Sequence, residues 1–264
     1  MDEIFPRMVV GFILAAAIAY GARRARTLST SGALAAAAVG TTCVAAGWSW
    51  SIVLIAMFLT ATTLTRVGGR RKAARVEDAD GGESDGRTAV QVLANGALYT
   101  FAALISLTTS SLVPFVIGAG AIAAATADTW ATEIGTLSEK SPRSILTGKP
   151  VATGESGGVT FLGWLGAAGG AGAIAGTALA VGWPIAAGCA ALIGGIGGAT
   201  VDSLLGATLQ SRRWCDRCGK ETERRVHRCG TTTEYLRGIS WMDNNAVNAL
   251  SSLGGGILGM LCLI

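Results

Sequence analysis

Long apolar runs, separated by short polar segments, make up most of the chain. Eight of these runs approach the roughly 20 residues that a helix needs to cross a bilayer. They are Pro6–Ala22, Ser29–Gly47, Trp48–Thr65, Thr88–Ser110, Leu112–Gly135, Gly158–Val181, Trp183–Leu209 and Asp243–Leu263. Turn-forming residues separate runs that follow each other directly. The pattern predicts an all-α, polytopic membrane protein with about eight transmembrane helices.

The composition agrees with membrane spans and excludes other classes. Hydrophobic residues make up 50% of the chain and charged residues 14%, whereas soluble domains have about 25% charged residues. This balance excludes intrinsic disorder and argues against a soluble globule. The apolar stretch Met8–Tyr20 is followed by arginines and not by a small-residue cleavage site. We therefore interpret it as the first span and not as a signal peptide.

The basic residues sort the loops into two kinds. All of the 21 lysines and arginines except Arg7 lie in segments 23–26, 66–87, 140–149 and 212–237. These segments alternate with loops that contain no basic residue. Because cytoplasmic loops carry the excess of Lys and Arg, the four basic segments are predicted to be cytoplasmic and both termini to be outside.

Polar side chains inside spans are costly and usually functional, and here they gather at the cytoplasmic ends of the last five predicted helices. Spans one to three are only mildly polar. We therefore expect three accessory helices in 1–65, a charged loop in 66–87 and a five-helix catalytic core in 88–264, with cytoplasmic loops 136–157 and 210–242. The polar set comprises Gln91, Asn95, Asp128, Thr129, Glu133, Asp202, Ser203, Gln210, Asp243, Asn244 and Asn248. Residence in the headgroup region is the alternative for any one of them.

Four carboxylates, on three helices, lie near one membrane face in this topology: Asp128, Glu133, Asp202 and Asp243. Hard oxygen ligands at this density suit Mg²⁺, which takes one or two carboxylates together with phosphates. Asp128 and Glu133 are five residues apart, which is about 140° around a helix, so they cannot share one face squarely.

A glycine-rich segment, Thr153–Gly158, precedes the sixth predicted span. A helix N-terminus offers free N–H groups and a positive dipole end to an anion. The segment lacks the Gly-Lys-Ser/Thr of a P-loop, and a flexible turn is the alternative interpretation. The candidate phosphate-binding residues are Lys149, Gly154, Ser156, Gly157, Gly158 and Thr160.

Three G-x-x-x-G pairs occur in the sixth and seventh runs: Gly166/Gly170, Gly172/Gly176 and Gly194/Gly198. They predict close helix packing, although some could instead leave a groove for an isoprenoid tail.

The last cytoplasmic loop contains Cys215-x2-Cys218-x8-His227-x-Cys229. Three cysteines and a histidine could hold a structural Zn²⁺. Reduced thiols without metal, or a catalytic thiol, are the alternatives, and a disulfide is disfavoured on the cytosolic side.

Several collinear motifs resemble a known family. They are Gln91–Gly96, Ala127–Gly135, Thr147–Pro150, Ser156–Thr160, Asp202–Gln210, Cys215-x2-Cys218, His227–Gly230 and Asn244-x3-Asn248. In this order they resemble the transmembrane-protein-19-like integral membrane family, also known as domain of unknown function 92, which includes the plant phytyl-phosphate kinases. The resemblance covers nearly the whole chain and is weakest over residues 1–65.

The resemblance implies transfer of a nucleotide γ-phosphate to a prenyl monophosphate, giving the prenyl diphosphate. It implies CTP or another nucleoside triphosphate as donor, Mg²⁺ as cofactor and a phytyl, geranylgeranyl or polyprenyl phosphate as acceptor, with no nucleic-acid partner. Asp128, Glu133 and Asp202 would be the catalytic, Mg²⁺-holding residues. The other polar residues would orient substrate. Without a plastid transit peptide, we expect a prokaryotic plasma membrane, with the active site on its cytoplasmic side.

Three other functions fit the same residues. A transporter of a lipid phosphate or anion would use the carboxylates for ion coupling, and it predicts a polar path to the outer face. A non-catalytic scaffold would recruit a partner through the Cys/His loop. A CTP-dependent nucleotidyltransferase would release pyrophosphate.

Overall fold

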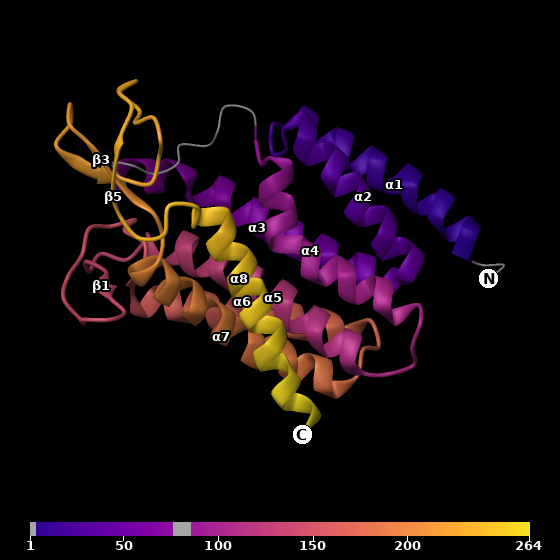
Figure 1. Cartoon of the computed structure of the whole chain (residues 1–264). Coiled ribbons are helices and arrows are strands. Elements are labelled where there is room, and N and C mark those ends of the chain that lie inside the picture. Colours follow the sequence, from indigo (N-terminus) through magenta and orange to yellow (C-terminus); the bar gives the residue numbers. More distant parts are fainter. Residues whose placement is uncertain (1–3, 76–85) are drawn as a thin grey trace.

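The computed structural model describes residues 4–75 and 86–264 of the chain. Eight α-helices occur in these residues (Figure 1). They are α1 (Ile4–Arg24), α2 (Thr30–Ala46), α3 (Trp48–Arg75), α4 (Ala89–Ser106), α5 (Val113–Gly135), α6 (Phe161–Ala180), α7 (Ile185–Thr208) and α8 (Asn244–Gly259). Seven of them are long and apolar enough to cross a membrane, while α2, with 17 residues, is shorter. The predicted all-α polytopic membrane fold is confirmed.

Four helices, α2, α4, α6 and α8, begin where the sequence provides capping groups. Ser29, Thr160 and Asp243 each accept a hydrogen bond from a backbone N–H in the first turn, at the starts of α2, α6 and α8. Thr88 and Gln91 form a capping box at the start of α4. These side chains satisfy donors that a helix start otherwise leaves unpaired.

Helix α5 lies at the centre of the bundle and packs against α3, α4, α6, α7 and α8. Its residues from Val116 to Ala127 are almost all buried. Small residues allow this crowding, because a Cβ at Gly120 or Gly194 would lie 2.3 Å from the carbonyl oxygen of Gly255 on α8. Close packing is therefore confirmed for the Gly194/Gly198 pair.

The other two glycine pairs, both on α6, behave differently from each other. A Cβ at Gly166 would lie 2.6 Å from the Trp130 carbonyl oxygen of α5, and one at Gly170 would lie 3.0 Å from that of Thr126, so this pair also packs closely. A Cβ at Gly172 or Gly176 would meet nothing within 4 Å. The prediction of close packing is wrong for this pair, because these glycines do not face a neighbouring helix.

An aromatic cluster fills the bundle where α3 and α5 begin. Trp50 packs against Tyr99, Phe115 and Trp183 with ring centroids 4.6–5.3 Å apart. The Tyr99 hydroxyl donates a hydrogen bond to the Trp50 carbonyl oxygen at 2.5 Å. Trp50, Tyr99 and Trp183 are all buried.

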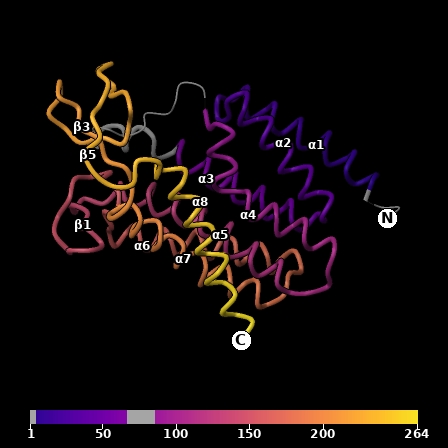
Figure 2. Tube along the Cα trace, viewed as in Figure 1, coloured from indigo at the N-terminus to yellow at the C-terminus, as the bar shows by residue number. Residues whose placement is uncertain are grey.

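Two small antiparallel sheets lie together at one end of the bundle, and both termini lie away from them (Figures 1 and 2). One sheet pairs β1 (Arg143–Ser144) with β2 (Gly158–Val159). The other has the order β4 (Lys220–Thr222), β3 (Arg212–Cys215) and β5 (Glu234–Arg237). An isolated bridge between Leu28 and Arg87 joins two further basic segments. The described parts of the segments predicted to be cytoplasmic thus meet at one end.

Candidate functional site

Two aspartates predicted as catalytic, Asp128 and Asp202, lie on helices that pack directly against each other, α5 and α7. The carboxylates of Asp128 and of Glu223, which follows β4, act electrostatically on that of Asp202. The Oδ2 atom of Asp202 is buried and has no hydrogen-bond partner among the described residues. Burying a carboxylate oxygen is costly unless a donor or a cation compensates it. A cation or a proton could compensate this oxygen.

Glu223 connects the three-stranded sheet to the membrane bundle. Its Oε1 accepts a hydrogen bond from Ser156 Oγ at 2.5 Å, and its Oε2 accepts one from Gln210 Nε2 at 2.8 Å. Arg212 Nη1 lies 3.3 Å from Glu223 Oε1, and its Nη2 donates to the Ser156 carbonyl oxygen at 3.4 Å. Gln210 and Arg212 are buried. This network holds the glycine-rich segment, the end of α7 and the sheet together.

Glu133, the third predicted catalytic residue, lies farther along α5 and faces different partners. Its Oε1 accepts a hydrogen bond from Thr65 of α3 at 3.1 Å, and its carboxylate acts electrostatically on Arg87. Burial lowers the pKa of the Arg87 guanidinium, and the charge of Glu133 opposes this shift. The structure therefore associates Glu133 with a basic neighbour, and Asp128 with Asp202.

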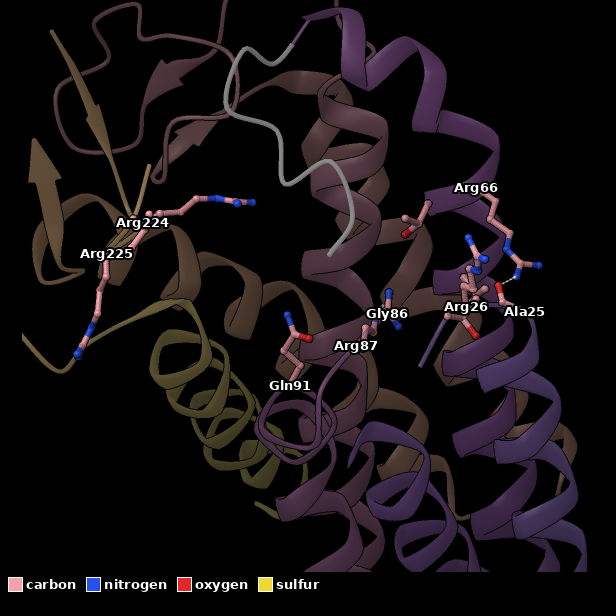
Figure 3. A pocket seen from close by; sticks show the side chains of 12 residues that line it. Ala25, Arg26, Arg66, Gly86, Arg87, Gln91, Arg224 and Arg225 are labelled. Carbon is pink, nitrogen blue, oxygen red and sulfur yellow. Dashed lines mark hydrogen bonds between the residues drawn. The ribbon is translucent and has the colours of Figure 1, made fainter. Parts of the chain in front are cut away.

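A cavity of about 570 Å³ opens between the basic segments (Figure 3). Thr65 and Gln91 line it, and so do five arginines from three separate parts of the chain. The arginines are Arg26, Arg66, Arg87, Arg224 and Arg225. In Figure 3, Arg224 extends from the sheet segment toward the cavity, while Arg66 donates to the Ala25 carbonyl oxygen at 3.2 Å. A cavity with this lining suits an anion with several negative charges, because guanidinium groups match phosphate oxygens in charge and geometry.

The glycine-rich segment reaches the site through Ser156. Gly157 lies so close to α7 that a Cβ there would be 2.4 Å from that of Ala207. Thr160 caps α6, Gly158 belongs to β2, and Gly154 forms a turn with φ +90°. Lys149 lies on the exposed turn after β1. Binding of phosphate by these residues stays a prediction.

Several predicted orienting residues also have local structural roles. Gln91 Oε1 accepts from the Thr88 N–H at 2.8 Å. Asn95 donates to the Gln91 carbonyl oxygen, and Thr129 to that of Ala125. Asp243 caps α8 and is exposed, as is Asn244, while Ser203 and Asn248 are half-buried. Of this set, Gln91 lines the cavity described above. The orienting roles of all of them, Gln91 included, stay predictions.

The Cys/His motif forms a compact cluster on the three-stranded sheet. One potential ligand atom from each of Cys215, Cys218, His227 and Cys229 lies within 4.8 Å of all the others. The Thr231 hydroxyl and the His227 ring lower the pKa of the Cys229 thiol to about 5. A hydrogen bond with Cys229 raises the pKa of Cys218 to about 11.

Comparison with known proteins places the chain in a family. The family model "Integral membrane protein DUF92" matches residues 13–256. The chain belongs to the DUF92 family of integral membrane proteins. It is 32% identical to Protein PGR of Arabidopsis thaliana, over 94% of this chain and 93% of that protein. It is 27% identical to an uncharacterized membrane protein of Methanocaldococcus jannaschii, over 98% and 95% of the two chains. No solved structure matches it.

In this DUF92 protein, sequence reasoning missed Glu223, Arg212 and the arginines of the cavity. All of them lie in segments rich in charge, where one acidic or basic residue does not stand out from its neighbours. The high density of arginine in these loops indicates membrane orientation but not which arginines share a cavity. Their convergence depends on contacts between segments far apart in the chain.

Proposed function

We propose that this DUF92 protein is a prenyl-monophosphate kinase. It would transfer the γ-phosphate of a nucleoside triphosphate, CTP or another, to a prenyl monophosphate such as geranylgeranyl or phytyl phosphate. The observation that carries the proposal is the buried Oδ2 of Asp202, which acts on Asp128 electrostatically and has no hydrogen-bond partner in residues 4–75 and 86–264.

The residues at this position fit Mg²⁺. Asp128 and Asp202 supply carboxylate oxygens from two helices, and Mg²⁺ typically takes one or two carboxylates and completes its shell with phosphate oxygens and water. Glu223 already accepts hydrogen bonds from Ser156 and Gln210 and forms an ion pair with Arg212. We therefore assign it a positioning role and not metal binding. The ion would supply neutralisation of the phosphate charge.

The arginine-lined cavity supports the choice of a polyphosphate co-substrate. Arg87 and Arg224 would bind and orient the negatively charged phosphates, and Gln91 offers an amide at the same wall. Glu133 accepts from Thr65 beside Arg87 and would keep that guanidinium oriented. These side chains would thus bind the nucleotide phosphates, and the two aspartates would bind Mg²⁺.

The reaction needs little proton transfer. An oxygen of the prenyl phosphate forms a bond to the γ-phosphorus while the bond to the β–γ bridging oxygen breaks, and the nucleoside diphosphate leaves with that oxygen. A phosphate monoester loses its second proton with a pKa of about 6, so the attacking oxygen is ionised near neutral pH. Positioning and charge neutralisation by the protein then account for the rate.

The aromatic cluster weighs against the transporter alternative. That alternative predicts a polar path through the bundle, whereas Trp50, Tyr99, Phe115 and Trp183 pack tightly where α3 and α5 begin.

The test is a transfer assay with protein purified in detergent. The protein is incubated with Mg²⁺, prenyl monophosphates of several chain lengths, and CTP or ATP labelled at the γ-phosphate. We expect label in a prenyl diphosphate and release of the nucleoside diphosphate. In a parallel assay the CTP is labelled at its α-phosphate. If this label appears in the lipid and pyrophosphate is released, the protein is instead a nucleotidyltransferase. No transfer by folded protein, together with lipid-phosphate flux in liposomes, would overturn the kinase proposal.

A further inference from the structure

The four members of the Cys/His cluster are presented by two similar turns. Cys215 ends β3, and the turn to Cys218 closes with a hydrogen bond from the Gly219 N–H to the Cys215 carbonyl oxygen at 2.8 Å. His227 and Cys229 lie in a second turn, in which the Gly230 N–H donates to the His227 carbonyl oxygen, also at 2.8 Å. Gly219 and Gly230 have φ values of +60° and +81°, which glycine adopts without a steric penalty. Two tight turns thus face each other with their ligating atoms inward.

Two of the distances between the ligating atoms are close to those of a tetrahedral metal site. Zn–S bonds of about 2.3 Å and Zn–N bonds of about 2.0 Å give S···S edges of about 3.8 Å and N···S edges of about 3.5 Å. Cys215 Sγ lies 3.6 Å from Cys229 Sγ, and His227 Nδ1 lies 3.2 Å from Cys229 Sγ. A disulfide would require about 2.05 Å between sulfurs, so these cysteines are reduced thiols that converge on one point.

The sheet that carries the cluster lacks an apolar core. Within the fully described segment 212–237, the buried residues are Arg212, Cys215, Thr222, His227 and Thr233. The large hydrophobic side chains of this segment, among them Tyr235 and Leu236, are exposed. Segments of this size that cannot bury enough apolar surface usually depend on a disulfide or a structural metal.

The charge around the cluster also suits a thiolate-rich metal site. Zn²⁺ with three thiolates and a neutral histidine carries a net charge of about −1. The same segment contains Arg213, Arg217, Arg224, Arg225 and Arg228. Arg217 donates to the Cys229 carbonyl oxygen at 3.2 Å, which places a guanidinium at the edge of the cluster.

From these observations we infer that Cys215, Cys218, His227 and Cys229 bind one structural Zn²⁺, which holds the three-stranded sheet together. The metal would join the β3–β4 hairpin to the turn before β5. Glu223 follows β4 directly and holds Ser156 and Gln210. The zinc site would therefore position the residues around Asp202 without touching substrate.

Metal content tests the inference independently of any kinase activity. Protein purified in detergent without chelators should contain about one zinc ion per chain, as measured by elemental analysis. Cys218→Ser should lower this content severalfold, and Cys189→Ser, which removes an exposed cysteine of α7 outside the cluster, should leave it unchanged. Equal zinc content in the wild type and the Cys218→Ser variant, or no zinc in folded wild-type protein, would overturn the inference.

A second measurement separates metal binding from a folding defect of the variant. Cys218 is exposed, so a maleimide applied at mildly alkaline pH, where more of its thiol is ionised, should label it readily unless it binds metal. In the untreated wild-type protein we expect slow labelling of Cys218, and fast labelling after a zinc chelator is added. Replacement of zinc by Co²⁺ should produce the visible absorption of tetrahedral cobalt thiolate. Rapid labelling before chelation, or absence of that absorption, would contradict the zinc site even if Cys218→Ser fails to fold.

Discussion

Ser156 Oγ donates a hydrogen bond to Glu223 Oε1 across 67 residues of sequence, at a distance of 2.5 Å. This bond joins the glycine-rich segment before α6 to the three-stranded sheet after α7. Because Glu223 also holds Gln210 and Arg212, one carboxylate fixes the relative position of three parts of the chain that surround Asp202.

Replacing Glu223 by Gln should loosen the sheet from the bundle. The variant loses the ion pair with buried Arg212, and removing one partner of a buried ion pair costs about 3–5 kcal/mol. We expect amide hydrogen exchange in residues 210–242 to accelerate about tenfold or more. Glu221→Gln is the matched control, because the Glu221–Arg237 pair is 3.8 Å long and about half exposed and contributes little. Equal exchange in both variants would contradict the positioning role of Glu223.

Asp202→Asn should abolish phosphoryl transfer while the protein remains folded. The amide has nearly the shape of the carboxylate but lacks the charge that holds a cation, so we expect kcat to fall by at least about 10²-fold. Glu139→Gln, in an exposed loop position, should keep the wild-type rate. Transfer rates and thermal unfolding in detergent are to be measured in parallel. A wild-type rate in Asp202→Asn would exclude Asp202 from the site.

Arg87→Ala should weaken binding of the nucleotide more than it slows the reaction. We expect the KM for the nucleotide to rise by about tenfold, with Arg87→Lys intermediate because an ammonium group lacks the planar donor pair. Lys140→Ala, in the exposed loop after α5, serves as the control for loss of one positive charge. If both alanine variants raise KM equally, the cavity does not bind the nucleotide specifically.

Gly194→Ala and Gly172→Ala make the same chemical change in opposite surroundings. The new Cβ at position 194 would lie 2.3 Å from the Gly255 carbonyl oxygen and 2.7 Å from Gly120 Cα, so backbone would have to move. We expect a loss of about 1–3 kcal/mol of stability there. At position 172 nothing lies within 4 Å, and alanine favours the helix. Thermal unfolding followed by tryptophan fluorescence should show a lower midpoint for Gly194→Ala alone.

The helical part of the fold was predictable because each span carries its own signal. An apolar run of sufficient length, such as Val113–Gly135, specifies a span without reference to any partner. Capping residues such as Thr160 and Asp243 mark helix starts locally. The short strands were not predicted, because β3, β4 and β5 consist mainly of charged and polar residues and have no alternating apolar pattern.

The candidate site was only partly predictable. Asp128 and Asp202 stand out as charges within apolar helices, and the structure places their helices in contact. Glu133 belongs to the same helix as Asp128, but the helical turn between them directs it toward Thr65 and Arg87. The predicted packing role of Gly172 and Gly176 failed for a similar reason, since a glycine pair does not indicate which face of its helix meets a neighbour.

By itself the sequence determined the membrane spans and the four residues of the Cys/His cluster, because hydropathy and close ligand spacing are local properties. The orientation that loop charge indicates stays a prediction. Only the tertiary structure decided which polar residues share a site. Glu223 comes to Ser156, and Arg224 to the cavity beside Arg87, through packing of segments that are distant in the chain. No local sequence pattern predicts these contacts, because they depend on how the helices, with their many small residues, pack around α5.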